Sequence, residues 1–283
     1  MTWQEFKTWQ KQPYEVAPMS EERHRCSTCG TEYQGNYCPR CGQSARIGRY
    51  SLTKAVVLLL DVWGLGNRGM FRTLRDLILR PGYMIRDYLS GMQMAYFPPF
   101  KLFFLLTTLS LLVEGGMNIS GVNYLDVSRE QFKTGFTDSF KENPTDVPPE
   151  TRAINAKTEQ FGVYLMGFTQ KFPSISTLAL LLVLSGFLYI FFRRSPYIPD
   201  LRFSELLVAL VYITDMLSVY NIVLEFFSVN PLIVYASTLL ALIPLRQLSG
   251  FSLLKCIFFL LLSFLMLMLC FILAGIVIAV MSL

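Results

Sequence analysis

Long apolar runs, rather than periodic stripes, dominate the chain after residue 97. An α-helix needs about 20 apolar residues to cross a bilayer, and five runs are near or above this length. The pattern predicts an all-α polytopic membrane protein with a membrane domain over residues 97–283. The predicted spans lie near residues 98–119, 174–192, 203–227, 231–246 and 252–282.

Three other segments have weaker apolar patterns. Residues 120–172 are polar with apolar positions at helical spacing, which predicts a helical hairpin outside the membrane. Residues 52–65 are interrupted by Asp61 and by glycines, so an interfacial and a re-entrant placement both remain open. Residues 1–22 fit either a short amphipathic helix or a flexible tail.

Residues 50–96 combine apolar and basic positions in a way that is typical of helices at a membrane surface. From Met70 to Arg80, apolar side chains fall on one helical face and charged side chains on the other. Such a helix lies in the plane of the lipid headgroups. The candidate contacts to anionic headgroups are Arg72, Arg75, Arg80 and Arg86.

Two matched C-x-x-C-G motifs lie close together near the N-terminus, within a predicted zinc ribbon over residues 23–45. The first holds Cys26 and Cys29, and the second holds Cys38 and Cys41. Four thiolates suit a tetrahedral zinc ion and leave no open coordination position, so we predict a structural Zn²⁺ site. Two disulfides and a redox pair are the alternatives, but a matched pair of such motifs favours zinc.

The third predicted span carries a polar stripe. Thr214, Ser218, Asn221 and Glu225 fall on one helical face, and Asp215 lies close to it. A carboxylate inside a membrane is costly, which makes it a candidate functional residue. A hydrogen-bonded seam between helices is the alternative interpretation.

Composition and charge indicate how the chain sits in a membrane. Hydrophobic residues make up 53% of the chain and charged residues only 16%, which excludes an ordinary soluble domain. Residues 1–101 hold 14 Lys/Arg against 8 Asp/Glu. Because basic loops stay on the cytoplasmic side, we expect the N-terminus and the ribbon inside and the C-terminus outside.

Three sequence stretches together resemble a known family: the double knuckle ending in Gln43, then Arg80-Pro-Gly-Tyr-Met-Ile-Arg-Asp-Tyr-Leu-Ser-Gly91, then Tyr96-Phe-Pro-Pro-Phe-Lys-Leu-Phe-Phe104. They are similar to an uncharacterised family of bacterial integral membrane proteins with an N-terminal zinc ribbon. The resemblance implies a metal ribbon and a bacterial inner-membrane location. It implies no activity.

No nucleophile elbow, zinc-protease, phosphate-loop or dinucleotide signature occurs in a suitable context, which argues against an enzyme. We therefore predict a membrane scaffold or regulator with a protein partner or a homo-oligomeric state. Its basic residues are expected to contact the bilayer and its anionic headgroups, not nucleic acid. The alternatives are a small-solute, ion or lipid transporter, and an enzyme acting on a phosphorylated lipid.

Overall fold

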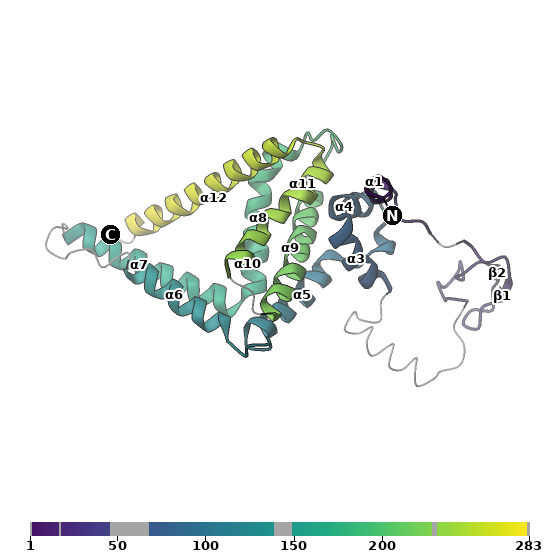
Figure 1. Cartoon of the computed structure of the whole chain (residues 1–283), viewed down its shortest axis with the longest axis horizontal. Coiled ribbons are helices and arrows are strands. Elements are labelled where there is room, and N and C mark those ends of the chain that lie inside the picture. The colour runs from purple at the N-terminus through teal and green to yellow at the C-terminus, as the bar shows by residue number, and fades with distance from the viewer. Residues whose placement is uncertain (1, 17, 46–67, 139–148, 228–230, 282–283) are drawn as a thin grey trace.

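Helices make up most of the regular structure in this computed structural model, which describes residues 2–16, 18–45, 68–138, 149–227 and 231–281 (Figure 1). The N-terminal part contains α1 (Trp3–Lys11), β1 (Arg23–Arg25) and β2 (Glu32–Gln34). These are followed by α3 (Arg68–Leu79), α4 (Pro81–Leu89), the 3-10 helix η1 (Gln93–Ala95) and α5 (Pro99–Glu114). The later elements are α6 (Tyr124–Asp138), α7 (Pro149–Lys171), α8 (Pro173–Phe192), α9 (Phe203–Phe226), α10 (Pro231–Ser237), η2 (Thr238–Ala241), α11 (Leu242–Ser249) and α12 (Leu253–Met281).

Five helical segments of the described chain are long and apolar enough to cross a membrane. They cover Gln93–Glu114, Pro173–Phe192, Phe203–Phe226, Leu232–Ser249 and Leu253–Phe271. The predicted helical fold with about five segments of spanning length is therefore confirmed.

Helix α9 lies at the centre of the bundle, in contact with α4, α5, α8 and α10 (Figure 1). Its middle is buried on nearly all sides, as expected from residues 206–213, which are apolar around the helix. Tyr212 is fully buried, and its hydroxyl donates a hydrogen bond to the carbonyl oxygen of Phe97 at 2.7 Å. Its ring meets the edge of Tyr88 with centroids 5.2 Å apart. These contacts tie α9 to α4 and to the start of α5.

Helices α4 and α11 approach closely at a glycine. A Cβ atom on Gly82 would lie 2.6 Å from the carbonyl oxygen of Pro244, so a larger residue cannot fit without a shift. The Gly82 N–H donates to Oε1 of Gln247 at 2.9 Å. Pro81 begins α4, where a missing N–H leaves no intrahelical bond unmade. This close contact joins α4 to the end of the fourth spanning segment.

The first spanning helix ends earlier in the chain than predicted. α5 ends at Glu114, whereas the prediction extended the span to residue 119. The side-chain amide of Asn118 donates to the carbonyl oxygens of Val113 and Val122, at 3.0 and 2.7 Å. A side chain that satisfies carbonyls on both sides of the turn ends the helix there.

The fourth predicted span, 231–246, is interrupted and extends to Ser249. It consists of α10, the 3-10 segment η2 and α11. Pro244 has no N–H, and in a regular α-helix its ring would clash with the carbonyl group four residues earlier. A short 3-10 segment ahead of the proline accommodates this constraint.

The polar insertion between the first two spans forms α6 and α7, which contact each other. Figure 1 shows these two helices projecting together from one end of the bundle. The long α12 begins beside α8 at the opposite end of the bundle. It then slants toward α7 and contacts it as well. The segment predicted as interfacial or re-entrant, 52–65, lies outside the described residues.

Candidate functional site

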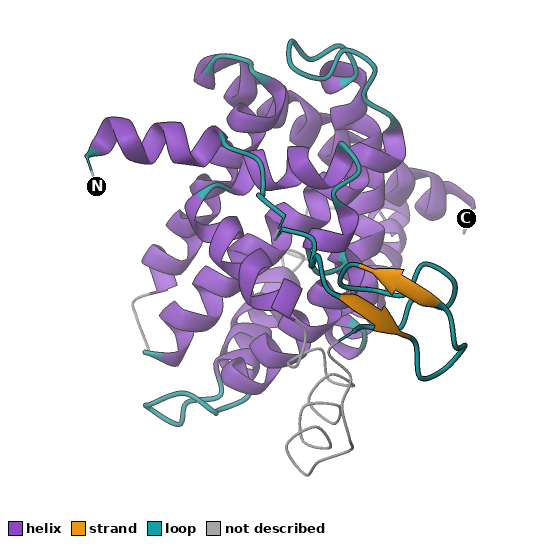
Figure 2. Cartoon of the chain, turned by 90° about the vertical axis from the view of Figure 1, so that its right-hand side faces the viewer, coloured by secondary structure: helices purple, strands orange, loops and turns teal. Residues whose placement is uncertain are grey.

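The ribbon (residues 23–45) is built from a short antiparallel hairpin and two turns with the same conformation (Figure 2). In each turn the glycine N–H donates to the carbonyl oxygen of the first cysteine, Gly30 to Cys26 and Gly42 to Cys38, both at 2.9 Å. The two glycines have φ values of 73° and 74°, a left-handed conformation that glycine adopts without strain. The matched sequence motifs therefore form matched turns.

The four cysteine sulfurs converge on one point. The Sγ atoms of Cys26 and Cys41 are 3.4 Å apart, those of Cys29 and Cys38 are 3.6 Å apart, and all four lie within 4.8 Å of one another. Tetrahedral zinc with Zn–S bonds of about 2.3 Å places sulfurs about 3.8 Å apart. A disulfide needs about 2.05 Å, and all four thiols are free. The arrangement is compatible with a bound metal ion.

Hydrogen bonds set the acidity of these thiols unequally. Contacts with Thr31 lower the pKa of the Cys29 thiol to about 6. The Gln43 backbone N–H lowers the pKa of Cys41, but the neighbouring sulfur of Cys26 and burial outweigh it and raise this pKa to about 12. Four thiolates repel one another, so a cation is needed before all four can ionise together.

The side chain of Gln43 connects the two turns. Its amide nitrogen donates to the hydroxyl of Ser27 at 2.7 Å, and its Oε1 accepts a hydrogen bond from Thr28. Gln43 follows the second motif, whereas both hydroxyls belong to the first. His24 is not among the clustered ligands, and its ring lies 5.7 Å from that of Tyr33.

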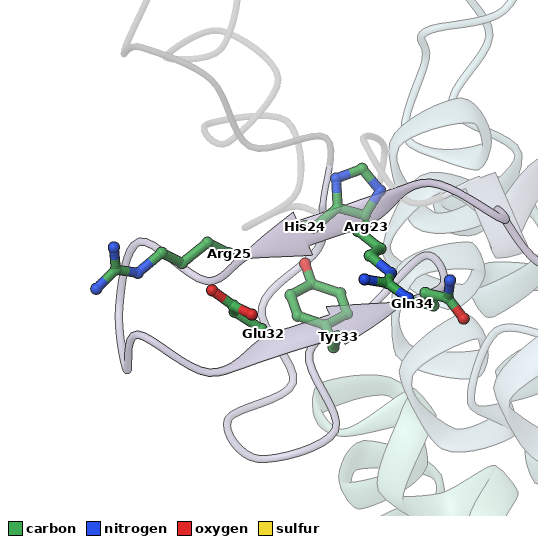
Figure 3. A pocket seen from close by; sticks show the side chains of 6 residues that line it. All are labelled: Arg23, His24, Arg25, Glu32, Tyr33 and Gln34. Carbon is green, nitrogen blue, oxygen red and sulfur yellow. The ribbon is translucent and has the colours of Figure 1, made fainter.

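The outer surface of the hairpin is polar and carries two arginines (Figure 3). Arg25 lies opposite Glu32 at one end of the strands, and Arg23 lies opposite Gln34 at the other. These side chains border a hollow of about 530 Å³, with Tyr33 among its lining residues. The hairpin therefore offers a hydrogen-bonding surface next to the metal-ligand cluster.

A second cluster of polar side chains lies inside the helical bundle. Arg80 is only 3% exposed and forms ion pairs with Asp76, whose Oδ2 is 3.7 Å from its Nε, and with Asp87. The Tyr96 hydroxyl donates to Oδ2 of Asp87 at 3.3 Å. Burial raises the pKa of Asp87, although Arg80 and Tyr96 act in the opposite direction. We call these four residues the Arg80 cluster.

The Arg80 cluster also holds the N-terminal arm (residues 2–16). Arg80 donates to the carbonyl oxygens of Gln10, at 3.2 Å, and of Gln12. The side-chain amide of Gln10 in turn donates to the carbonyl oxygen of Leu79 at 2.5 Å. One buried guanidinium therefore joins α3, α4 and the chain that leads to the ribbon.

All four arginines predicted to contact headgroups also bond to other groups of the protein, and their contact with headgroups stays a prediction. Arg80 is buried as described above. Arg86 donates to the carbonyl oxygens of Gln247 and Leu248 at the end of α11. Arg72 donates to the carbonyl oxygen of Ala95 at 3.0 Å. Unpaired carbonyls at helix ends attract arginine strongly. Arg75 is the exposed member of this set, with 55% of its side chain accessible, and it pairs with Asp76 at 2.8 Å.

Some residues of the predicted polar stripe on α9 have hydrogen-bond partners, whereas its two carboxylates hold buried oxygens without one among the described residues. Asn221 accepts a hydrogen bond at 2.8 Å from Ser237 of α10, and Thr214 donates to the carbonyl oxygen of Leu210. Asp215 is 0% exposed, and neither of its carboxylate oxygens has a hydrogen-bond partner among the described residues. One oxygen of Glu225, Oε2, is buried in the same way. Ser218 is half-buried on the same helix.

Sequence reasoning missed the Arg80 cluster and the role of Gln43. Asp76 and Arg80 are four residues apart on a helix, a spacing that signals a pair, but the amphipathic pattern favoured a solvated face. Asp87 and Tyr96 are seven and sixteen residues from Arg80, and their approach depends on the turn between α3 and α4.

Five helices of spanning length indicate a multi-pass membrane protein, and its four clustered cysteines are compatible with a bound metal ion. Residues 67–111 match a family described as "Protein of unknown function (DUF3667)". This segment contains α3, α4, η1 and most of α5, and therefore the complete Arg80 cluster. Neither the curated proteins nor the solved structures that were compared include a match to this chain.

The cysteine cluster predicts one zinc ion that is lost when a ligand is removed. We expect purified wild-type protein to contain equimolar zinc, and Cys38→Ser to contain little, because binding of structural zinc contributes about 10–16 kcal/mol through all its ligands. Elemental analysis by mass spectrometry measures this. Cys270→Ser is the control, since Cys270 is a free, exposed cysteine of α12. Because protons compete for thiolates, lowering the pH should release the metal. Equal zinc in both variants would contradict the assignment.

The Arg80 cluster predicts a large effect of Arg80→Met. Removing one partner leaves two carboxylates buried, so the free energy of unfolding should fall by about 3–5 kcal/mol. Arg194→Met is the control and should change the free energy of unfolding by about 0.5 kcal/mol or less, because Arg194 is exposed after α8 and lies outside the cluster. Thermal and denaturant unfolding in detergent measures both.

A second readout reports on the N-terminal arm. Trypsin should cleave between Lys11 and Gln12 faster in Arg80→Met, because the two carbonyls flanking Lys11 lose their donor. Arg194→Met should be cleaved at the wild-type rate. If the two variants are cleaved equally fast at this bond, Arg80 does not hold the arm.

Proposed function

We propose that this protein is a non-enzymatic adaptor of the bacterial inner membrane, with a structural zinc ion in a cytoplasmic ribbon that docks a protein partner. The observation that carries the proposal is the bond between Arg80 and the carbonyl oxygens of Gln10 and Gln12. It links α3 and α4, which pack against the spanning helix α9, to the arm that precedes the ribbon.

The ribbon has the properties of a docking module. It has its own small core of Cys26, Tyr33 and Cys38, separate from the core of the helical bundle. Figure 1 places its strands away from the helices, on the side of α1 and α3. Its polar hairpin surface is therefore available to a partner, and the two arginines favour an acidic segment.

Charges support the proposed orientation. Arg86 joins α4 to the end of α11, and it also lies 4.5 Å from the ring of Tyr197 in the link after α8. Helix α4, the link between α8 and α9, and the end of α11 that leads to α12 therefore lie at the same end of the bundle. This end carries Arg193, Arg194, Arg202, Arg246 and Lys255. Basic residues mark the cytoplasmic side.

Purification from native membranes in a mild detergent tests the adaptor. We expect a stoichiometric protein partner with wild type and with Cys270→Ser, and its loss with Cys38→Ser, as read by quantitative mass spectrometry. The variant Arg23→Glu/Arg25→Glu should lose the partner while keeping zinc. Arg40→Glu, an exposed charge change elsewhere on the ribbon, should keep both. The same partners in every variant, or a homo-oligomer without any partner, would contradict the adaptor.

A second candidate function is supported by the buried carboxylate of α9. An unpartnered acid in a spanning helix is expensive, and such residues often belong to proton or ion pathways. Asp215 would then bind and release a proton during transport. The nearby polar residues Thr214, Ser218, Asn221 and Glu225 would form the rest of the path.

Proton flux in proteoliposomes distinguishes this candidate. If Asp215 carries protons, an imposed pH gradient should drive dye-detected proton uptake with wild type, and Asp215→Asn should abolish it. Glu205→Gln is the control, because Glu205 lies on the same helix but pairs with the Arg202 backbone N–H at its end. Flux that is absent in wild type, or unchanged in Asp215→Asn, would exclude the pathway.

A further inference from the structure

A cavity of about 380 Å³ lies between α1 and the helical bundle. Trp3 and Phe6 line it from α1, Ile78 from α3, Met216 and Tyr220 from α9, and Ile243 from α11. This volume is within the range of about 300–1,000 Å³ typical of small-molecule sites. Four helices that are distant in sequence therefore share one space.

The interior of the cavity is apolar. Its two glutamines are already engaged, since Gln10 donates to the carbonyl oxygen of Leu79 and Gln247 accepts from the N–H of Gly82. The remaining lining residues are hydrophobic or aromatic. Water gains few hydrogen bonds in such a space, so an apolar ligand is favoured over solvent.

The cavity lies beside the middle of α9, near the level where α5 begins. Tyr212, one turn before Met216, donates to the carbonyl oxygen of Phe97 just ahead of α5. The wall formed by Met216, Tyr220 and Ile243 belongs to spanning segments, whereas α1 and α3 lie outside them. The cavity therefore joins a wall of spanning-segment residues to helices that lie outside those segments.

Helix α1 covers the cavity without being buried itself. None of its residues is fully buried, and Trp3 is 68% exposed although it lines the cavity. Trp3, Phe6 and Gln10 share one helical face. The apolar part of this face is therefore only partly covered by the rest of the chain.

One cation stands next to a lining residue, and a second stands beside Trp9, which belongs to the same helix but does not line the cavity. The Lys7 ammonium lies 5.2 Å from the ring centroid of Trp3, and the Arg75 guanidinium lies 5.9 Å from that of Trp9. Lys7 is one turn after Trp3 and close to the lining face, whereas Glu5 falls on the opposite side of α1. An apolar cavity bordered by cations complements an anionic amphiphile.

We propose that this cavity binds one acyl chain of an anionic membrane phospholipid, whose phosphate lies near the cations of α1 and α3. The apolar wall receives the chain, and the exposed face of Trp3 closes over it. This site is independent of the ribbon and of its partner. Lipid binding would strengthen the contact between the N-terminal arm and the bundle.

Fluorescence quenching tests the site. The variant Trp9→Phe/Trp63→Phe leaves Trp3 as the remaining tryptophan. Delipidated protein in detergent is titrated with phosphatidylglycerol brominated on its acyl chains, with brominated phosphatidylcholine in parallel. We expect quenching that saturates near equimolar phosphatidylglycerol and is at least about tenfold weaker in affinity for phosphatidylcholine.

Two neighbouring substitutions locate the site. Leu240→Phe fills the cavity and should weaken binding by about tenfold or more. Leu239→Phe is the control, because Leu239 precedes it in η2, is 67% exposed and does not line the cavity. Ile243→Phe provides a second filling variant should Leu240→Phe lower the melting temperature.

The outcomes separate clearly. Quenching that never saturates, that is equal for both lipids, or that survives in properly folded Leu240→Phe and Ile243→Phe would overturn the proposal. Saturable, phosphatidylglycerol-selective quenching that only the filling variants lose would establish it. Since no partner protein is present in this assay, its result does not depend on whether the ribbon is an adaptor.

Discussion

The placement of the buried guanidinium of Arg80 constrains the rest of the structure. A charge removed from water needs compensating charges and hydrogen bonds nearby, and Arg80 obtains them from Asp76, Asp87 and the arm carbonyls. Arg75 adds a second cation to Asp76 at 2.8 Å, which balances the two carboxylates. These contacts fix the geometry of the turn between α3 and α4. They also fix the position of the arm at Gln10 and Gln12.

This constraint connects parts of the molecule that otherwise have separate cores. The bundle is held by apolar packing around α9, and the ribbon is held by its own turns and sulfurs. The arm adds no fully buried residue to either core, although its Tyr14 packs against the bundle core. The arm depends instead on a few polar bonds and on ring contacts such as that between Arg72 and Tyr14, 3.8 Å apart. Such a connection can be weakened locally without unfolding either core.

The segment that matches a family of unknown function is the part of the chain in which these polar contacts are concentrated. Thr73 is fully buried there and accepts a hydrogen bond from the Phe97 N–H at 2.7 Å, which fixes the entry into α5. The Tyr212 hydroxyl donates a hydrogen bond to the carbonyl oxygen of the same residue, Phe97. Surface helices and spanning helices thus form one continuous unit at this end of the bundle.

Local sequence determined which segments are helical and apolar, and where four sulfurs would meet. Spanning helices follow from run length alone, and the two C-x-x-C-G turns are formed by contacts within a few residues, as at Gly30 and Gly42. Only the tertiary structure decided which arginines face water. Arg72, Arg80 and Arg86 look alike in an amphipathic pattern, yet each is bound to a carbonyl or carboxylate supplied by another element. Helical periodicity records the face on which a side chain lies, whereas its partner depends on how distant elements pack together.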